Sequence, residues 1–270
     1  MKYFYDAEFI EGTQSKSFLG IKYGITKPTI DIISIGIISE DNREYYAISK
    51  DFNLQEAWNR YDVKEANTSA NHTMNDIQVY WIRTNVLEPI YSELLFKENI
   101  YANQALHRAN VYIPETKYNF TYNNLKKLIN KYGKHNEEIA EEIKEFTYQS
   151  THEIQTGYKP ESIELYGYYS AYDHVALCWL FGKMIDLPKG FPMFTKDLKQ
   201  MLDEKQEYYI QNKIPTMKMT KDIDILPNLV EQTKLSSLKN LSSYPKQENE
   251  HNSLDDAKFN KKLYNFLKQI

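Results

Sequence analysis

Runs of aromatic and β-branched residues dominate the first fifty positions of the chain. Residues 1–10 read MKYFYDAEFI, residues 29–39 read TIDIISIGIIS, and residues 43–49 read REYYAIS. Residues of this kind suit the pleated surface of a strand, and the short Asp-Asn step between the last two runs suits a hairpin turn. The pattern predicts three consecutive strands arranged as a meander, with the polar, glycine-containing residues 11–28 forming a loop.

Farther along, apolar residues recur at helical spacing and shorter strand-like runs separate them. Helical periodicity covers residues 77–95, where Pro89 is expected to kink or end the helix, whereas residues 53–73 are polar and irregular. The other expected elements are strands at 162–169 and at the start of 192–206, each leading into a helix, and a final helix from about residue 254. This order indicates an α/β fold in which helices cover a mixed sheet.

Two acidic residues interrupt the first apolar strand. Asp6 and Glu8 stand two positions apart, so both side chains project from the same face of the strand. Two neighbouring carboxylates in an apolar setting repel each other and lose hydration, and a divalent cation relieves both problems. The pattern therefore favours a metal site on this strand. A solvated edge strand with alternating polar positions is the alternative.

Composition places the chain among folded proteins and excludes several classes. It has 270 residues, 41% of them hydrophobic, a net charge of -4 and a single cysteine, Cys178. One cysteine excludes an internal disulfide and a cysteine-rich zinc module. The negative charge argues against coating nucleic acid by charge alone. Without a long apolar run or a signal-like start, we expect no membrane segment and a cytoplasmic location.

One stretch differs from the rest in its local charge. Residues 117–136 hold five lysines and no acid, interleaved with four aromatic residues. Lysines for phosphates and aromatic rings for bases are the ingredients of a surface that binds single-stranded nucleic acid, and Lys126 and Lys127 are its central candidates. An amphipathic helix whose lysines face water explains the pattern equally well.

Further acids occur where later elements begin. Asp173 stands where the strand at 162–169 turns into a helix, and His251 precedes Asp256 by five residues at the start of the final helix. Each has an ordinary structural explanation. Asp173 can cap its helix, while Ser253 can cap the last helix with Asp256 in its favourable first turn.

Taken in order, these residues resemble the DEDDh exonucleases of the ribonuclease-H-like superfamily, which includes RNase T, oligoribonuclease and the proofreading subunit of bacterial replicases. The chain is most similar to the branch of small bacterial 3'-to-5' exoribonucleases typified by the mycobacterial AS-type enzyme. The blocks that carry this resemblance are YFYDAEFIEGT, TIDIISIGIISEDNREYYAIS, WIRTNVL, SIELYGYYSAYDHVALCWLFG and HNSLDDA.

The resemblance implies a fold and a domain organisation. We expect an α/β, ribonuclease-H-like domain over residues 1–270, with a mixed five-stranded sheet flanked by helices. Helical insertions are expected at about 52–75, 98–160 and 203–250, where the chain is longer than the family pattern requires. A homodimer is a possible assembly that the resemblance also implies.

The resemblance further implies a two-metal site that binds Mg²⁺ or Mn²⁺ through carboxylates. Asp6 would bridge two ions, Glu8 and Asp256 would complete the first site, and Asp173 would hold the second. His251 would act as general base. Its neighbour Asp255 competes with Asp256, but the family spacing favours Asp256 and leaves Asp255 as first-turn helix charge.

The expected function is 3'-to-5' exonuclease activity on single-stranded or overhanging RNA. Phe9 follows the acidic pair and is a candidate for stacking on the terminal base, with a core role as the alternative; Arg83 is a candidate for a phosphate or subunit contact. The same chemistry on the 3' ends of DNA, a catalytically silent nucleic-acid-binding module, and an enzyme acting on free nucleotides are the alternatives. Nothing in the sequence identifies a contact to the 2'-hydroxyl.

Overall fold

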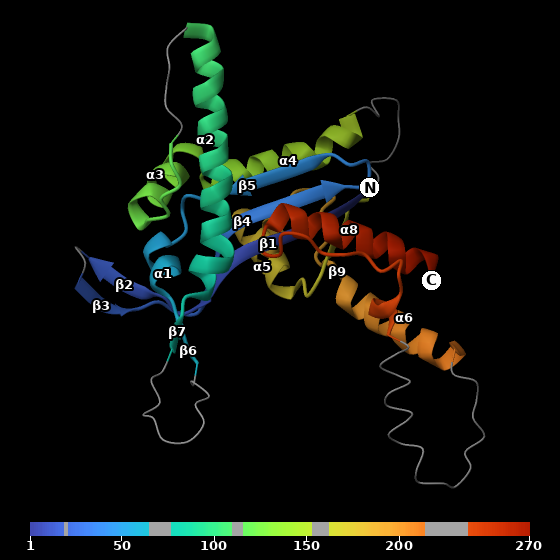
Figure 1. Ribbon diagram of the computed structural model, residues 1–270. Helices are drawn as coiled ribbons and strands as arrows, with labels where there is room; N and C mark the ends of the chain where they lie inside the picture. The colour runs from blue at the N-terminus through green and yellow to red at the C-terminus, as the bar shows by residue number, and fades with distance from the viewer. Residues whose placement is uncertain (19–20, 65–76, 110–115, 153–161, 214–236) are drawn as a thin grey trace.

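A computed structural model describes residues 1–18, 21–64, 77–109, 116–152, 162–213 and 237–270. Its centre is a mixed sheet of five strands in the order β5-β4-β1-β8-β9 (Figure 1). The strands are β1 (Lys2–Gly12), β4 (Thr29–Ser39), β5 (Glu44–Ile48), β8 (Glu164–Gly167) and β9 (Lys196–Asp197). The meander is confirmed, because β4 pairs antiparallel with both β1 and β5, while β8 runs parallel to β1.

Helices cover both faces of this sheet and confirm the predicted α/β class (Figure 1). Their bounds are α1 Leu54–Asn59, α2 Glu88–Ala109, α3 Tyr122–Tyr132, α4 Asn136–His152, α5 Ala171–Leu180, α6 Leu198–Lys213 and α8 Ser253–Gln269. The first β-strand and the last helix pack directly on each other, so elements from opposite ends of the described sequence lie together at the sheet. No helix among the described residues combines the length and apolar character needed to cross a membrane.

Alternation along β1 decides which layer each side chain enters. Tyr3, Tyr5 and Ala7 belong to the core beneath the sheet, together with residues of α4 and α5. Phe4 points the opposite way, into the core formed with α6 and α8. Because side chains two residues apart share a face, Asp6 and Glu8 follow Phe4 towards the α8 side of the sheet.

Two segments interpreted as irregular contain regular structure instead. Residues 11–28 form a hairpin of β2 (Ser15–Phe18) and β3 (Ile21–Ile25), and residues 53–73 include α1 and β6 (Asp62–Lys64). The hairpin escaped prediction because its apolar residues Ile21, Tyr23 and Ile25 are all strongly exposed, so no burial pattern marks it. Residues 65–76 lie outside the described part of the chain.

The predicted helix at 77–95 begins differently from expectation. Its first residues form β7 (Ile77–Val79), which pairs with β6, and a π-helical turn at Arg83–Leu87 leads into α2. Pro89 therefore neither ends nor interrupts α2, but follows the π-turn directly. A proline has no N–H and crowds the carbonyl four residues earlier, so a locally wider turn accommodates it.

Candidate active site

Gly36 brings the start of α8 onto the sheet above the acidic pair. It lies opposite Asp6 in the β1–β4 ladder, and a Cβ atom there would overlap the backbone of Ser253 and Leu254. The Ser253 hydroxyl bonds Ser34 on β4 at 3.1 Å, which fixes the contact. Because α8 begins this close to the strands, the residues just before and within its first turn reach β1.

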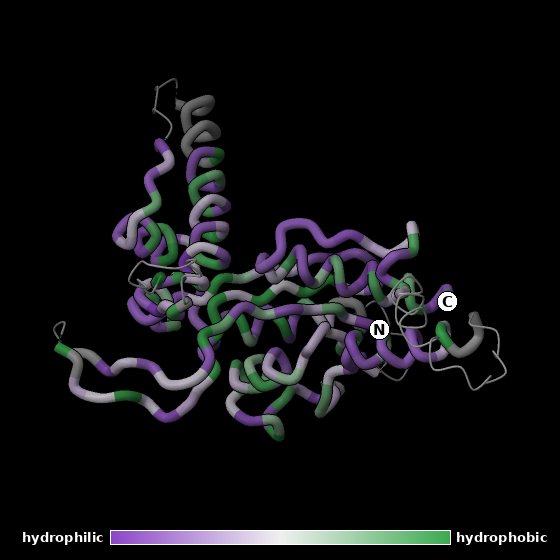
Figure 2. Tube along the Cα trace, turned by 60° about the horizontal axis from the view of Figure 1, so that its bottom comes forward, coloured by the Kyte–Doolittle hydropathy of each residue, from purple (hydrophilic) through white to green (hydrophobic). Residues whose placement is uncertain are grey.

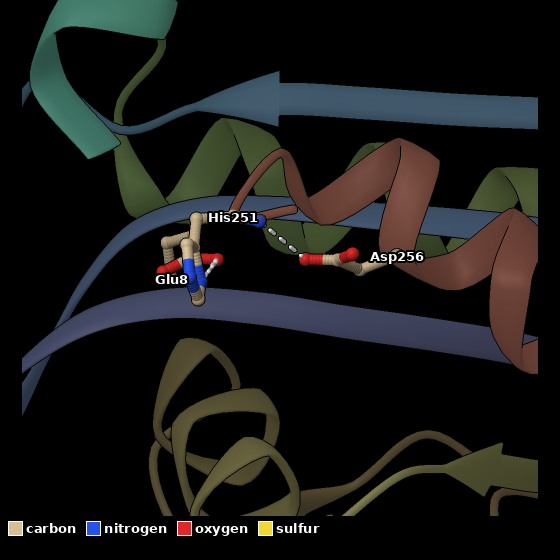
Figure 3. Close-up of side chains that lie close together, drawn as sticks. All are labelled: Glu8, His251 and Asp256. Carbon is tan, nitrogen blue, oxygen red and sulfur yellow. Dashed lines mark hydrogen bonds and ion pairs between the residues drawn. The ribbon is translucent and has the colours of Figure 1, made fainter. Parts of the chain in front are cut away.

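Glu8, His251 and Asp256 form one cluster at this junction (Figure 3). One ligating atom from each lies within 4.8 Å of the others. His251 Nδ1 is 3.9 Å from Glu8 Oε1, and the His251 backbone N–H donates to Asp256 Oδ2 at 2.8 Å. Gln247 Nε2 donates to the other Asp256 oxygen at 2.6 Å. Asp256 is thus oriented by the same loop that presents the imidazole.

The loop before α8 has a fixed and unusual backbone. Asn249 and His251 both adopt positive φ, 50° and 69° respectively, a region that non-glycine residues visit rarely. Asn252, and not Ser253, caps the helix, because its side-chain oxygen accepts the N–H groups of Leu254 and Asp255. Ser253 turns instead into the buried contact with β4. The cap and the strained turn together aim the His251 ring back towards β1.

Asp173 reaches the site from the other side of β1. Strand β8 pairs with β1 only as far as Phe4, which leaves the Ala7 N–H without a strand partner. Asp173 Oδ1 accepts that N–H at 2.9 Å, and the side chain is only 6% exposed. Asp173 lies in the first turn of α5 rather than at its N-cap, which is Ser170. Its carboxylate therefore joins α5 to β1 instead of simply capping a helix.

Burial perturbs all four carboxylates, and repulsion by the other acids of the site adds to it at Asp6 and Glu8. Burial, followed by the charges of Asp173, Glu8 and Asp256, holds the pKa of Asp6 well above its usual range. Burial and the nearby acids raise the pKa of Glu8 to about 9, and burial raises the pKa of Asp173 to about 7. Burial also raises the pKa of Asp256. The site thus gathers carboxyl groups whose charged forms the folded protein does not stabilise by itself.

The donor set fits a hard divalent cation. Within the described ranges, no lysine or arginine forms an ion pair with Asp6, Glu8, Asp173 or Asp256, and His251 is the one basic side chain in contact. Carboxylate oxygens are preferred ligands of Mg²⁺ and Mn²⁺, and such an ion would remove the repulsion that raises these pKa values. Glu8, Asp256 and Asp6 could hold one ion, and Asp173 could help to hold a second beside Asp6.

A cavity of about 360 Å³ adjoins the cluster. Glu8 and Phe9 line one end of it, and Trp81 lines its wall. The Trp81 ring also meets His251 edge to face, with 4.7 Å between the centroids. Phe9 packs edge-on against Tyr172 at 6.1 Å while remaining accessible from the cavity, so its stacking role stays a prediction. Sequence reasoning did not assign a role to Trp81, although its place in the WIRTNVL block was visible.

The basic stretch forms α3, an amphipathic helix away from the cluster (Figure 1). Leu125, Leu128 and Ile129 are buried, whereas Lys126 and Lys127 are exposed on the opposite side. Two further lysines of the stretch are already paired with acids: Lys131 with Glu98 and Lys134 with Glu142. The structure brings neither Lys126 nor Lys127 into contact with the carboxylates, so a role in substrate binding stays a prediction.

Arg83 has a structural task within the chain. Its guanidinium donates to the Trp58 carbonyl and lies over the rings of Trp58 and Tyr80, at 4.7 and 3.9 Å from their centroids. Arg83 thus holds the π-turn against α1, and its candidate phosphate or subunit contact stays a prediction.

Comparison with known proteins gives consistent matches. Residues 23–267 match the family described as the 3'-5' exoribonuclease Rv2179c-like domain. Two curated relatives from Mycobacterium tuberculosis strains, named 3'-5' exoribonuclease Rv2179c and 3'-5' exoribonuclease MT2234.1, are each 28% identical over 207 residues, which is 76% of this chain and 76% of each relative. The family match includes Asp173, His251 and Asp256, and begins after Asp6 and Glu8.

Proposed function

This chain belongs to the 3'-5' exoribonuclease Rv2179c-like domain family, and we propose that it removes nucleotides from the 3' end of single-stranded or overhanging RNA. The proposed mechanism is metal-dependent and of the DEDDh type. The observation that carries this proposal is the cluster of Glu8, His251 and Asp256 at β1, with Asp6 on the same strand and Asp173 reaching that strand from α5. Asp173 and Asp256 are buried and Asp6 and Glu8 are half-buried, and none of the four has a lysine or arginine partner in the described structure, so a bound cation would explain their proximity.

The four carboxylates would hold two ions, Mg²⁺ or Mn²⁺. Bound there, such ions supply charge stabilisation at the scissile phosphate and make water a better nucleophile at neutral pH. The contribution of the chain is to present oxygen ligands in fixed positions: Asp173 is held by the Ala7 N–H, and Asp256 by Gln247 and the His251 backbone. These hydrogen bonds orient the ligands before any substrate arrives.

His251 would accept the proton of the attacking water. Imidazole exchanges protons near neutral pH, which suits a general base. The ring is 37% exposed, so solvent and substrate can reach it, while its backbone N–H remains anchored to Asp256. Trp81 packs against the ring edge and limits its swing. The imidazole is thus positioned without being enclosed.

RNA is the proposed substrate because both relatives carry exoribonuclease in their names. The cavity beside Glu8 would receive the terminal nucleotide, with Phe9 and Trp81 as apolar walls for its base. Lys126 and Lys127 would contact the backbone of longer strands. The corresponding activity on DNA differs only in the sugar, so the test compares both substrates.

The decisive experiment is a time course on 5'-labelled single-stranded RNA and DNA of one sequence with Mg²⁺ or Mn²⁺. We expect a ladder that shortens from the 3' end, faster on RNA, and that is lost with a chelator or in His251→Ala. His135→Ala is the matched control, because His135 pairs with Asp51 at 2.8 Å on the surface. Intact substrates with the wild-type protein, despite tight binding, would replace the proposal with a catalytically silent binding module.

A further inference from the structure

The β2–β3 hairpin and its flanking residues carry a local positive charge, as α3 also does. Residues 12–30 contain Lys16, Lys22 and Lys27 and no acid, although the chain has a net charge of -4. Lys16 and Lys27 are exposed, and neither forms an ion pair with any residue that the structure describes. A cluster of unpaired lysines on a ribbon attracts phosphate groups.

The same hairpin exposes large apolar side chains. Ile21, Tyr23 and Ile25 are 72%, 69% and 68% exposed, and the ribbon extends away from the body of the molecule (Figure 2). A two-stranded ribbon gains little stability by itself in water. Exposed aromatic and aliphatic residues beside lysines are the composition of a surface that binds single-stranded nucleic acid, since rings stack on bases while lysines contact phosphates.

The root of the hairpin is held firmly relative to β1. Arg60 follows the last residue of α1, and its guanidinium donates to the carbonyls of Glu11 and Thr13, on either side of Gly12 at the end of β1. Its partner Glu56, 3.1 Å away, also accepts the Ser15 N–H at 3.1 Å. The ribbon therefore leaves β1 in a fixed direction instead of hanging from a loose loop.

A continuous path joins the carboxylates to this root. The 360 Å³ cavity that begins at Glu8 is also lined by Glu11 and Arg60, the residues that anchor the hairpin. Along β1, Glu8 stands four positions before Gly12, the last residue of the strand, which is a span of about 13 Å at ~3.3 Å per residue. A strand whose 3' end lies at Glu8 would leave the cavity where the hairpin begins.

We propose that the β2–β3 hairpin binds the single-stranded RNA upstream of the nucleotide being removed, with Lys16 and Lys27 on phosphates and Tyr23 on a base. This inference rests on the proposed function, since it concerns the longer part of the same substrate. Charge decides the kind of partner: three lysines without an acid favour a polyanion over a second copy of this acidic chain. The hairpin thereby makes turnover depend on RNA length.

The test compares two variants, Lys16→Gln/Lys27→Gln and Tyr23→Ser, with the wild-type protein. The substrates are a dinucleotide and an RNA of about 20 nucleotides, a length that exceeds the ~4–16 nucleotides that a single-strand binding fold covers. We expect KM for the long RNA to rise several-fold and the dinucleotide kinetics to stay unchanged. The slope of the logarithm of the binding constant against the logarithm of the salt concentration should become shallower by ~1.4 in the double variant. Each lost phosphate contact reduces this slope by ~0.7, and the double variant loses two.

Lys189→Gln/Lys262→Gln is the matched control, because both lysines are exposed and the change in net charge is the same. An equal loss in this control, or unchanged KM on long RNA in both hairpin variants, would overturn the inference while leaving the exonuclease intact. A shift of the hairpin variants from dimer to monomer in sedimentation, with RNA affinity kept, would assign the surface to a second copy instead. Failure of the wild-type protein on both substrates would refute the proposed function itself.

Discussion

Replacing Asp173 by asparagine should stabilise the metal-free protein and abolish its activity. The amide oxygen of asparagine can still accept the Ala7 N–H that Asp173 accepts at 2.9 Å, so the link between α5 and β1 is kept. The variant loses only the negative charge. If Asp173 were an ordinary helix cap, its replacement would cost about 1 kcal/mol or less and would spare activity.

The size of the gain follows from the pKa of Asp173, which burial raises to about 7 in the folded protein. An unfolded aspartate has a pKa of about 3.9, so the difference of ~3 units corresponds to about 4 kcal/mol at most. Local relaxation and water entry soften the cost of burying the charge, so the measured gain should be smaller, about 1–3 kcal/mol. Because the folded pKa is raised, the stability that the protonated acid contributes is present below pH ~4 and is lost as the pH rises towards 7.

Urea unfolding in the presence of a chelator, at several pH values between 4 and 8, measures this effect directly. The wild-type free energy of unfolding should fall across the range, and that of Asp173→Asn should fall less, so that the two curves separate above pH ~5. Asp186→Asn, an exposed acid, is the control and should keep both activity and the wild-type curve. A variant that is less stable than wild type at pH 8, or one that still shortens RNA, would refute the assignment of Asp173.

Three further perturbations test other parts of the site. Gly36→Ala should push the start of α8 off β4, costing about 1–3 kcal/mol in urea unfolding and most of the turnover on RNA. Gly24→Ala, where a Cβ meets nothing, is the stability control and should change the free energy of unfolding little. Adding Mg²⁺ at 100 times its Kd should raise the free energy of unfolding of the wild-type protein by about 2.7 kcal/mol, as measured by calorimetry. At the same Mg²⁺ concentration, the free energy of unfolding of Asp6→Asn should rise clearly less. Lys126→Gln/Lys127→Gln should weaken binding to long single strands and flatten its salt dependence, and unchanged affinity would leave these lysines as the solvated face of α3.

The sequence predicts the buried part of the fold because burial imposes a period. Strand β1 alternates between two cores, and β4 is buried along most of its length, so both produce the aromatic and β-branched runs from which they were predicted. The β2–β3 hairpin obeys a different rule, since main-chain hydrogen bonds and contacts at its root define it while its apolar side chains face water. No periodic signal can reveal such a ribbon.

The candidate site divides in a similar way. The spacing of Asp6 and Glu8 is enough to place them on one face, because strand geometry is local. The approach of α8 is not local: it depends on the absence of a side chain at Gly36 and on a cap by Asn252 that frees Ser253 to bond β4. Sequence alone therefore indicated the residues of the site through resemblance, whereas their proximity required the packed structure.

The packing of α8 on β1 also has a consequence for the order in which the protein becomes competent during its synthesis. Asn260 Nδ2 bonds the Tyr5 carbonyl, which joins residues 255 positions apart. A ribosome releases Asp6 and Glu8 first, and His251 and Asp256 follow tens of seconds later at ~5–20 residues per second. A nascent chain that has not yet reached α8 thus holds Asp6 and Glu8 without the helix that packs over them, and the cluster of Glu8, His251 and Asp256 forms only after α8 has been made.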